Sequence, residues 1–110
     1  MIKSLSIITR ASHLSHEEFI QLWEHEHAPL AHKVPYLLRY VLSPVHSQFE
    51  RSDVQAHGIA VDGIAELWYE SYETLAQAAQ TPEMKKLRAH GAKIIGQITN
   101  CLTTEIEIIN

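Results

Sequence analysis

The sequence has few of the features that mark disulfide-stabilised or nucleic-acid-binding proteins. Its 110 residues include a single cysteine, Cys101, which excludes an intrachain disulfide and any cysteine-based metal cluster within one chain. Thirteen Asp and Glu outnumber nine Lys and Arg, for a net charge of −4, and no basic run is longer than residues 85–86. Nucleic acid and anionic membranes are therefore not expected as partners.

Long apolar runs are missing as well. No stretch approaches the roughly 18 apolar residues that a membrane-spanning helix needs. Polar residues interrupt the first ten positions and no small-residue cleavage site follows, so a signal peptide is not expected. A cytoplasmic protein with one domain over residues 1–110 fits these features. A chain this short has room for one core, and we expect any sizeable pocket to need a partner chain.

Hydrophobic periodicity and turn signals divide the chain into strands and helices. Ser15 and Glu18 form a capping-box pattern at the start of the first helix, which Pro29 should end or kink, with a further turn possible to about Lys33. Gly91 is a plausible stop for the last helix. The expected elements are a strand at 2–9, a helix from 15, strands at 36–42 and 63–69, helical segments from 71 and 81, and a strand at 98–109.

One long segment fits neither a helix nor a strand. Residues 43–62 are mostly polar, with isolated apolar positions and Gly58. A stretch of this length without secondary structure is uncommon inside a compact domain. We interpret it as a lid, a dimer arm or a mobile loop.

The order strand, helix, strand, strand, helix, strand predicts an α+β fold of the ferredoxin-like, split βαβ type. Its antiparallel sheet would carry helices on one face only, so the other face needs a cover. In the strand at 63–69, Glu66 and Trp68 share one face, and Ala65, Leu67 and Tyr69 share the other. Bulky groups on both faces indicate a sheet packed on two sides, and a homodimer with facing sheets is the simplest way to achieve this.

Eight histidines are the unusual count in the composition. His13 and His16 flank the start of the first helix, where exposure is the simplest expectation. His46 and His57 fall in the irregular segment. His90 lies near a helix C-terminus, where backbone carbonyls favour a protonated imidazole. Position gives none of these five chemistry of its own, and each is expected to be structural or solvated.

The run from Glu24 to His27 suggests a metal site, but its spacing argues against one. Residues two apart on a helix point to nearly opposite sides, so His25 and His27 cannot bind one ion. Glu24 and His27 have the spacing found in di-iron bundles, which need several such helices. No His-Glu-x-x-His motif occurs. We therefore expect no metal site.

His27 is the histidine best placed for chemistry. Phe19, Trp23 and His27 are spaced by four residues, so His27 continues the apolar stripe at the end of its helix. An imidazole with a pKa near ~6.5 suits proton transfer, and a strand tyrosine, Tyr40, can donate a hydrogen bond to a carbonyl or enolate. A core histidine bonded to a carbonyl and a packing tyrosine are the alternatives. Glu66 is informative only if it faces the interior, where it needs a partner.

Several motifs, in order, resemble the EthD family, and they cover nearly the whole chain. Residues 95–105 are also similar to the methylmuconolactone methylisomerase branch of that family, whereas residues 28–32 follow the general family pattern. No cysteine stands near residues 23–24, where the isomerase has one. The matching segments are residues 14–19 with Trp23, 27–30, 35–40, 61–69 and 95–105.

The resemblance implies a dimeric α+β barrel, in which two ferredoxin-like protomers pack sheet to sheet. The methylisomerase relatives rearrange methyl-substituted lactones by acid–base chemistry without a cofactor, and their functional His and Tyr align with His27 and Tyr40. The expected function is therefore cofactor-free isomerase or lyase chemistry on a small apolar carbonyl or lactone compound in the barrel interior. His27 and Tyr40 would be catalytic, and Glu66 and Trp68 would bind the substrate.

Two other functions remain open from the sequence. The chain is compatible with a non-catalytic dimer that binds a hydrophobic metabolite. Relatives in the wider barrel superfamily use haem, so an oxygen- or haem-using oxidoreductase is the third possibility, although the chain has no specific haem motif. The sequence identifies no substrate.

Overall fold

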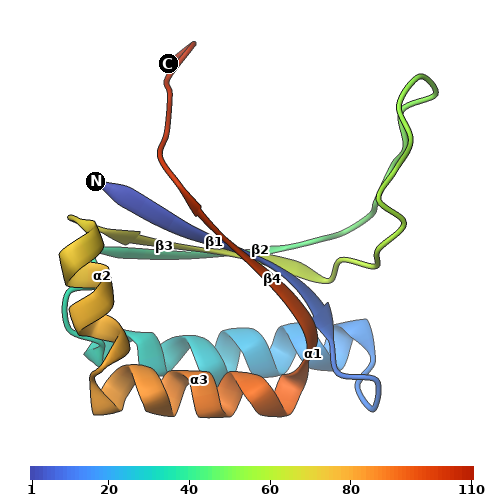
Figure 1. The fold of residues 1–110 in the computed structure, drawn as a ribbon. Coiled ribbons are helices and arrows are strands. Elements are labelled where there is room, and N and C mark those ends of the chain that lie inside the picture. Colours follow the sequence, from blue (N-terminus) through green and yellow to red (C-terminus); the bar gives the residue numbers. More distant parts are fainter.

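In the computed structural model, which describes residues 1–110, four antiparallel strands form one sheet with all helices on one of its faces (Figure 1). The strand order is β2-β3-β1-β4, which is the predicted ferredoxin-like α+β arrangement. The two central strands, β3 and β1, are thus neighbours in the sheet although they are far apart in the sequence. The strands are β1 (Ile2–Arg10), β2 (Arg39–Pro44), β3 (Gly63–Tyr69) and β4 (Ile95–Thr103).

The first helical region has three parts. The α-helix α1 (His16–Leu22) begins with the predicted capping box, since the Ser15 side chain accepts from the Glu18 amide and the Glu18 side chain accepts from the Ser15 amide. It continues as a π-helical turn, η1 (Trp23–His27), and a 3₁₀ turn, η2 (Ala28–Lys33). The helical path therefore ends at Lys33, after the further turn that the sequence allowed beyond Pro29. The π-helical turn η1 in the middle of this region was not predicted.

The second helical region consists of α2 (Tyr72–Ala79) and α3 (Pro82–Ile94). Ser71 and Thr81 cap these helices and Pro82 occupies the first turn of α3, all as predicted. In Figure 1, α3 runs beside the α1 region beneath the sheet, and α2 lies at one end. The prediction that the last helix stops at Gly91 is wrong, because α3 continues to Ile94.

Two strand predictions also need correction. β2 begins at Arg39 rather than at residue 36, because Tyr36 sits in a turn after Pro35 with a left-handed φ of 71°. β4 ends at Thr103, whereas the alternating pattern predicted a strand to residue 109. The Glu105 carboxylate accepts a hydrogen bond from Trp68 Nε1 at 3.0 Å, and β3 is separated from β4 by β1. This contact turns the C-terminal tail, residues 104–110, away from the sheet edge.

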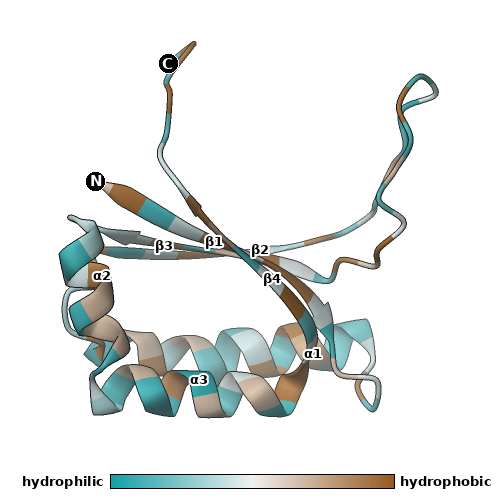
Figure 2. Cartoon of the chain, in the orientation of Figure 1, coloured by the Kyte–Doolittle hydropathy of each residue, from teal (hydrophilic) through white to brown (hydrophobic).

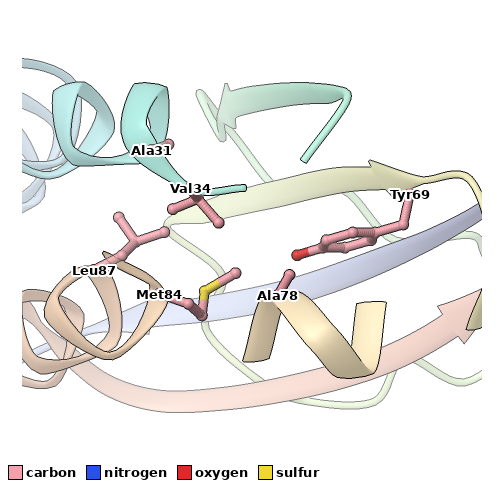
Figure 3. Close-up of a cluster of buried hydrophobic side chains, with 6 residues drawn as sticks. All are labelled: Ala31, Val34, Tyr69, Ala78, Met84 and Leu87. Carbon is pink, nitrogen blue, oxygen red and sulfur yellow. The ribbon is translucent and has the colours of Figure 1, made fainter. Parts of the chain in front are cut away.

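The hydrophobic core is divided into two clusters between the sheet and the helices. One cluster holds Tyr69, whose ring reaches from β3 toward Met84 and Ala78 (Figure 3). The other contains Phe19 and Trp23, together with Ile8, Ala65 and Ile94. Tyr40 and Leu67 pack against both clusters. These two residues, on β2 and β3, therefore join the two clusters into one core. A space remains between the clusters away from them.

The other face of the sheet carries no helix. Two segments project from the sheet on that side: the C-terminal tail and residues 45–62, here called the arm (Figure 1). Hydrophilic and hydrophobic stretches alternate along both (Figure 2). Phe49 on the arm is 90% exposed and Ile109 on the tail is 93% exposed. The predicted absence of regular structure after residue 43 is confirmed from residue 45 onward.

None of the helices combines the length and apolarity that crossing a bilayer would take.

Candidate functional site

A cavity of about 700 Å³ lies between the helix-covered face of the sheet and the helices of one chain. Pockets that hold small molecules are typically about 300–1,000 Å³. A pocket of this size is therefore formed within one chain, contrary to the expectation that it would need a partner chain, and its walls differ from those of the barrel interior predicted above. The gap between the two core clusters accounts for the space. Apolar side chains from β3, η1 and α3 form most of the wall, among them Leu67, Trp23, Met84 and Leu87.

The cavity opens between α3 and the edge strand β4. Its lining residues on that side are exposed, whereas those of β1 and η1 are buried or half-buried. α3 passes directly into β4 at Ile95, and the strand is exposed from Gly96 to Leu102. A ligand can therefore reach the interior from this edge. The exposed residues that line the opening are Arg88, Ala92, Gly96, Gln97, Ile98 and Asn100.

His27 and Tyr40, the two predicted catalytic residues, both line this cavity. His27 comes from the last position of η1 and is 6% exposed, and Tyr40 comes from β2 and is half-buried. The predicted apolar stripe is confirmed, because Phe19, Trp23 and His27 are all buried. The π-helical turn, in which the Ala28 amide bonds to the Trp23 carbonyl, is a feature often found at functional sites.

His27 is a neutral imidazole at neutral pH. Burial, reinforced by the neighbouring His90, lowers its pKa from 6.5 to about 4. Its Nδ1 lies 3.0 Å from Nδ1 of His90, and the two rings stack with centroids 5.1 Å apart. One of these nitrogens must carry a proton and the other a lone pair for the contact to be a hydrogen bond. The two rings therefore share one proton at this contact.

His90 was not predicted as a partner of His27. Its expected place was near the end of a helix, where a cation would interact with backbone carbonyls, but α3 continues for another turn. The two histidines are 63 residues apart in the chain. They meet because α3 packs against η1, and no local pattern in the sequence signals that contact.

Tyr40 remains a protonated phenol across the physiological range. Burial raises its pKa well above 10, and the nearby Tyr69 adds to this shift. Tyr69 also lines the cavity, and burial raises its pKa although the Arg88 charge opposes the change. Both phenols can donate a hydrogen bond to a ligand oxygen. They stand on neighbouring strands, β2 and β3.

The rest of the polar lining is uncharged except for one residue. Ser6 Oγ donates to Asn100 Oδ1 at 2.6 Å across β1 and β4, so the Asn100 amide nitrogen stays available to a ligand. Ser4 lies on the same face of β1. Arg88 is the only Lys, Arg, Asp or Glu in the lining, and no carboxylate of the protein lies within ion-pair distance of it. The site thus has an unpaired positive charge at its mouth.

The structure does not bring Glu66 and Trp68, the predicted substrate-binding residues, to the cavity. Strand alternation turns Ala65, Leu67 and Tyr69 toward the helices, so Glu66 and Trp68 lie on the helix-free face. There Lys3 Nζ is 2.8 Å from Glu66 Oε2, and the Arg39 guanidinium lies 4.5 Å from the centre of the Trp68 ring. The predicted face-sharing is confirmed, and the cavity lies on the opposite face of the sheet.

The remaining histidines add no second site. His16, which we expected to be exposed, is half-buried, with Nδ1 2.7 Å from Asp62 Oδ1. Burial opposes ionisation of Asp62, but hydrogen bonds from the Arg10 amide, His16 and the Arg10 side chain outweigh it and hold its pKa below the usual value. This network fixes the end of the arm to β1 and α1. No three His, Cys, Asp or Glu side chains are grouped so that they could hold a metal ion.

The family model described as EthD domain matches residues 11–97 of the sequence. No curated protein matches the sequence. Among solved structures, an ethyl tert-butyl ether degradation (EthD) family protein from Bacillus halodurans aligns with a TM-score of 0.76 at 21% identity, over 96% of this chain and 99% of that one.

Two more distant structures share the fold. A dimeric ferredoxin-like protein of unknown function from Thermobifida fusca aligns with a TM-score of 0.66 at 12% identity, covering 94% of this chain and 90% of that one. SnoaB, a cofactor-independent oxygenase from Streptomyces nogalater, aligns with a TM-score of 0.64 at 11% identity, covering 98% and 95%. At these identities the similarity shows the fold alone.

Proposed function

The chain belongs to the EthD family, and we propose that it is an enzyme that performs cofactor-free acid–base chemistry on a small, largely apolar carbonyl or lactone compound. The observation that carries this proposal is that His27 and Tyr40 line one cavity of suitable size. A neutral imidazole can accept a proton, and a protonated phenol can donate a hydrogen bond. The site therefore offers a base and an oxygen-stabilising group on the wall of the same chamber.

The chemistry begins with loss of a proton from a carbon next to the substrate carbonyl. His27 accepts this proton on a ring nitrogen, and the C–H bonding electrons move into the carbonyl to form an enolate. Tyr40 donates its hydroxyl hydrogen bond to the enolate oxygen, whose negative charge is largest after the proton has left. Return of a proton to a different carbon gives an isomer, with no net gain or loss of atoms.

The lining also indicates which ligands fit. Apolar side chains form most of the wall, and the Ser6–Asn100 pair provides a local polar contact. Arg88 places a positive charge at the mouth, and His27 adds none at neutral pH. We therefore assign the cavity to an apolar carbonyl or lactone compound whose acidic group, such as a carboxylate, lies beside Arg88.

A homodimer is the proposed assembly, with the helix-free faces of two copies packed together. The face has an apolar centre that includes Leu5 and Ile7, and the arm and tail project on its side with exposed Phe49 and Ile106. Large exposed apolar groups of this kind mark interaction surfaces. In this assembly Glu66 and Trp68 contribute to the subunit interface, not to substrate binding.

A non-catalytic ligand-binding dimer is the second candidate, and the low basicity of His27 favours it. An imidazole with a pKa of about 4 removes protons from carbon less effectively than one near 7. The cavity, its apolar wall and the charge at its mouth would serve such a protein equally well. The two functions differ in whether proton transfer to and from the bound molecule occurs.

Deuterium incorporation distinguishes them without knowledge of the natural substrate. The β,γ-unsaturated lactone α-angelica lactone would be incubated with the protein in D₂O and followed by proton NMR. The proposed enzyme accelerates deuterium uptake next to the carbonyl, and His27→Asn and Tyr40→Phe reduce this acceleration by about a hundredfold. Tyr36→Phe, which changes an exposed tyrosine outside the cavity, serves as the matched control. Binding of the lactone without accelerated exchange would support the binding protein.

A further inference from the structure

We propose that His90 is a positioning residue that relays protons between His27 and solvent, so that the two imidazoles act as one unit. Its role in a reaction rests on the proposed function, whereas the relay itself is a property of the two rings. The Nδ1 atoms lie 3.0 Å apart, which is hydrogen-bond distance. His27 is 6% exposed and lines the cavity, and His90 is half-buried and does not line it. The pair therefore spans the boundary between cavity and solvent.

The contact through Nδ1 determines which atoms are available on each ring. A hydrogen bond between two Nδ1 atoms uses one donor and one lone pair, so the rings must be in opposite tautomers. Nε2 is then the only nitrogen of His27 left for a ligand. When His27 holds its proton on Nδ1, its Nε2 has a free lone pair and is a base. When His90 supplies the shared proton, Nε2 of His27 carries a hydrogen and is an acid.

The relay moves a proton without leaving a buried cation. In the first state His27 has Nδ1–H and His90 has Nε2–H. Nε2 of His27 accepts a proton from the ligand, the Nδ1 proton of His27 passes to Nδ1 of His90, and Nε2 of His90 releases its proton to water. Both rings are neutral again, and one proton has moved from ligand to solvent. Reversal of these transfers returns a proton to the ligand.

The surroundings of the pair explain why such a path is needed. No carboxylate hydrogen-bonds or ion-pairs with either ring. A lasting imidazolium at His27 would thus be buried and uncompensated, which is costly. His90 is more exposed, so a charge passing through it is stabilised by water. The relay gives His27 the function of a base although a protonated His27 is disfavoured.

Gly91 allows the two rings to come together. Its position on α3 lies against the His27 ring, where an added β-carbon would be 3.2 Å from Cε1 of His27. Glycine within a helix costs about 1 kcal/mol relative to alanine. Here the absent side chain lets the α3 backbone approach closely enough for the neighbouring His90 to reach Nδ1 of His27. This is also why a glycine occurs inside α3 without ending the helix.

Exchange of the His27 ring hydrogen with water tests the relay without any substrate. The full-length protein would be labelled with ¹⁵N at histidine, and hydrogen exchange of the His27 imidazole would be measured by NMR at pH 7. His90→Phe keeps an aromatic ring beside His27 but removes both nitrogens, and we expect exchange to slow by about tenfold or more. His25→Phe, at an exposed position of η1, should leave the rate unchanged. Unchanged exchange in folded His90→Phe protein would overturn the relay.

A second variant keeps the test decisive if His90→Phe does not fold. His90→Asn retains a group that forms one hydrogen bond to His27 but cannot pass a proton onward, and it too should slow exchange by about tenfold. If His90→Asn instead exchanges at the wild-type rate, the contact is structural only. In the deuterium-incorporation assay, both variants should lower kcat with little change in KM. If that assay shows no turnover in the wild type, the proposed function fails while ring-hydrogen exchange still decides the relay.

Discussion

A β-carbon placed on Gly91 would lie 3.2 Å from Cε1 of His27, so the backbone of α3 runs directly against the imidazole. This approach joins the second helical region to the end of the first at the wall of the cavity. It also brings Nδ1 of His90, the preceding residue on α3, to 3.0 Å from Nδ1 of His27. The geometry of the candidate site therefore depends on Gly91, whose lack of a side chain allows α3 to approach His27 closely.

Gly91→Ala is expected to displace the His27 ring by a few tenths of an ångström. Alanine adds about 1 kcal/mol of helix propensity, but crowding a buried site costs about 1–3 kcal/mol, so the free energy of unfolding should fall by roughly 1 kcal/mol. The NMR signals of His27 and His90 should shift because their bond is strained. Urea unfolding and ¹⁵N-histidine spectra measure the two effects.

Ala89→Gly provides the control for Gly91→Ala on the exposed side of α3. It should lose about 1 kcal/mol through helix propensity alone and leave the His27 signals in place. A more stable Gly91→Ala protein with unchanged His27 signals would show that the ring has free space and that the contact does not set the geometry.

The buried His27 predicts a loss of stability on mild acidification. Its pKa in the folded protein is about 4, whereas it is 6.5 without the fold. Between these values the unfolded chain binds a proton that the folded protein does not, so the free energy of unfolding falls as the pH drops from about 6.5 to about 4. The loss is at most about 3 kcal/mol. Urea unfolding at several pH values in this range measures it.

His27→Phe should remove most of this pH dependence, because the buried imidazole whose pKa the fold lowers is gone. His25→Asn should retain it, since His25 is an exposed residue of η1. An NMR titration gives the same quantity directly. A His27 pKa near 6.5 in the folded protein would contradict both the burial argument and the predicted acid sensitivity.

Arg88 predicts selectivity for acidic ligands. 2-Naphthoate and 2-acetonaphthone have the same apolar body, but only the first carries a carboxylate. We expect Arg88→Gln to weaken binding of 2-naphthoate by about tenfold and to leave binding of 2-acetonaphthone unchanged, because a partly exposed charge-assisted bond contributes about 1–2 kcal/mol. Isothermal titration calorimetry gives both dissociation constants.

Lys85→Gln is the control for Arg88→Gln. It removes an exposed positive charge from the same helix but does not alter the cavity lining. If both substitutions weaken 2-naphthoate binding equally, the net charge of the protein, not the position of Arg88, determines the affinity. Equal loss for both ligands in Arg88→Gln would mean that Arg88 acts by packing.

Local signals predicted much of the fold. The caps at Ser15 and Thr81 each involve residues within three positions, so the sequence contains them in full. The spacing of Phe19, Trp23 and His27 correctly predicted a buried stripe for the same reason. Each of these features depends on residues that are close together in one helix, so the local sequence pattern is enough to predict it.

The errors involve contacts between distant segments. The tail leaves β4 because Glu105 reaches Trp68, and His90 pairs with His27 because α3 packs against η1. Glu66 was assigned to the substrate site because that site was expected in the barrel interior, between the facing sheets of two copies. The cavity of one chain lies instead on the helix-covered side of the sheet, with Ala65 and Leu67.

The helix-free face predicts a dimer that a single charge should disrupt. Leu5 lies at the centre of that face, because it pairs with Glu66 on β3 and Cys101 on β4 and points away from the cavity. In the proposed assembly Leu5→Glu buries a second carboxylate directly opposite Glu66, so we expect the protein to become monomeric at micromolar concentration. Lys85→Glu, on the exposed surface of α3, should leave the dimer intact. Sedimentation equilibrium separates these outcomes, and a wild-type protein that is monomeric at the same concentration would refute the assembly.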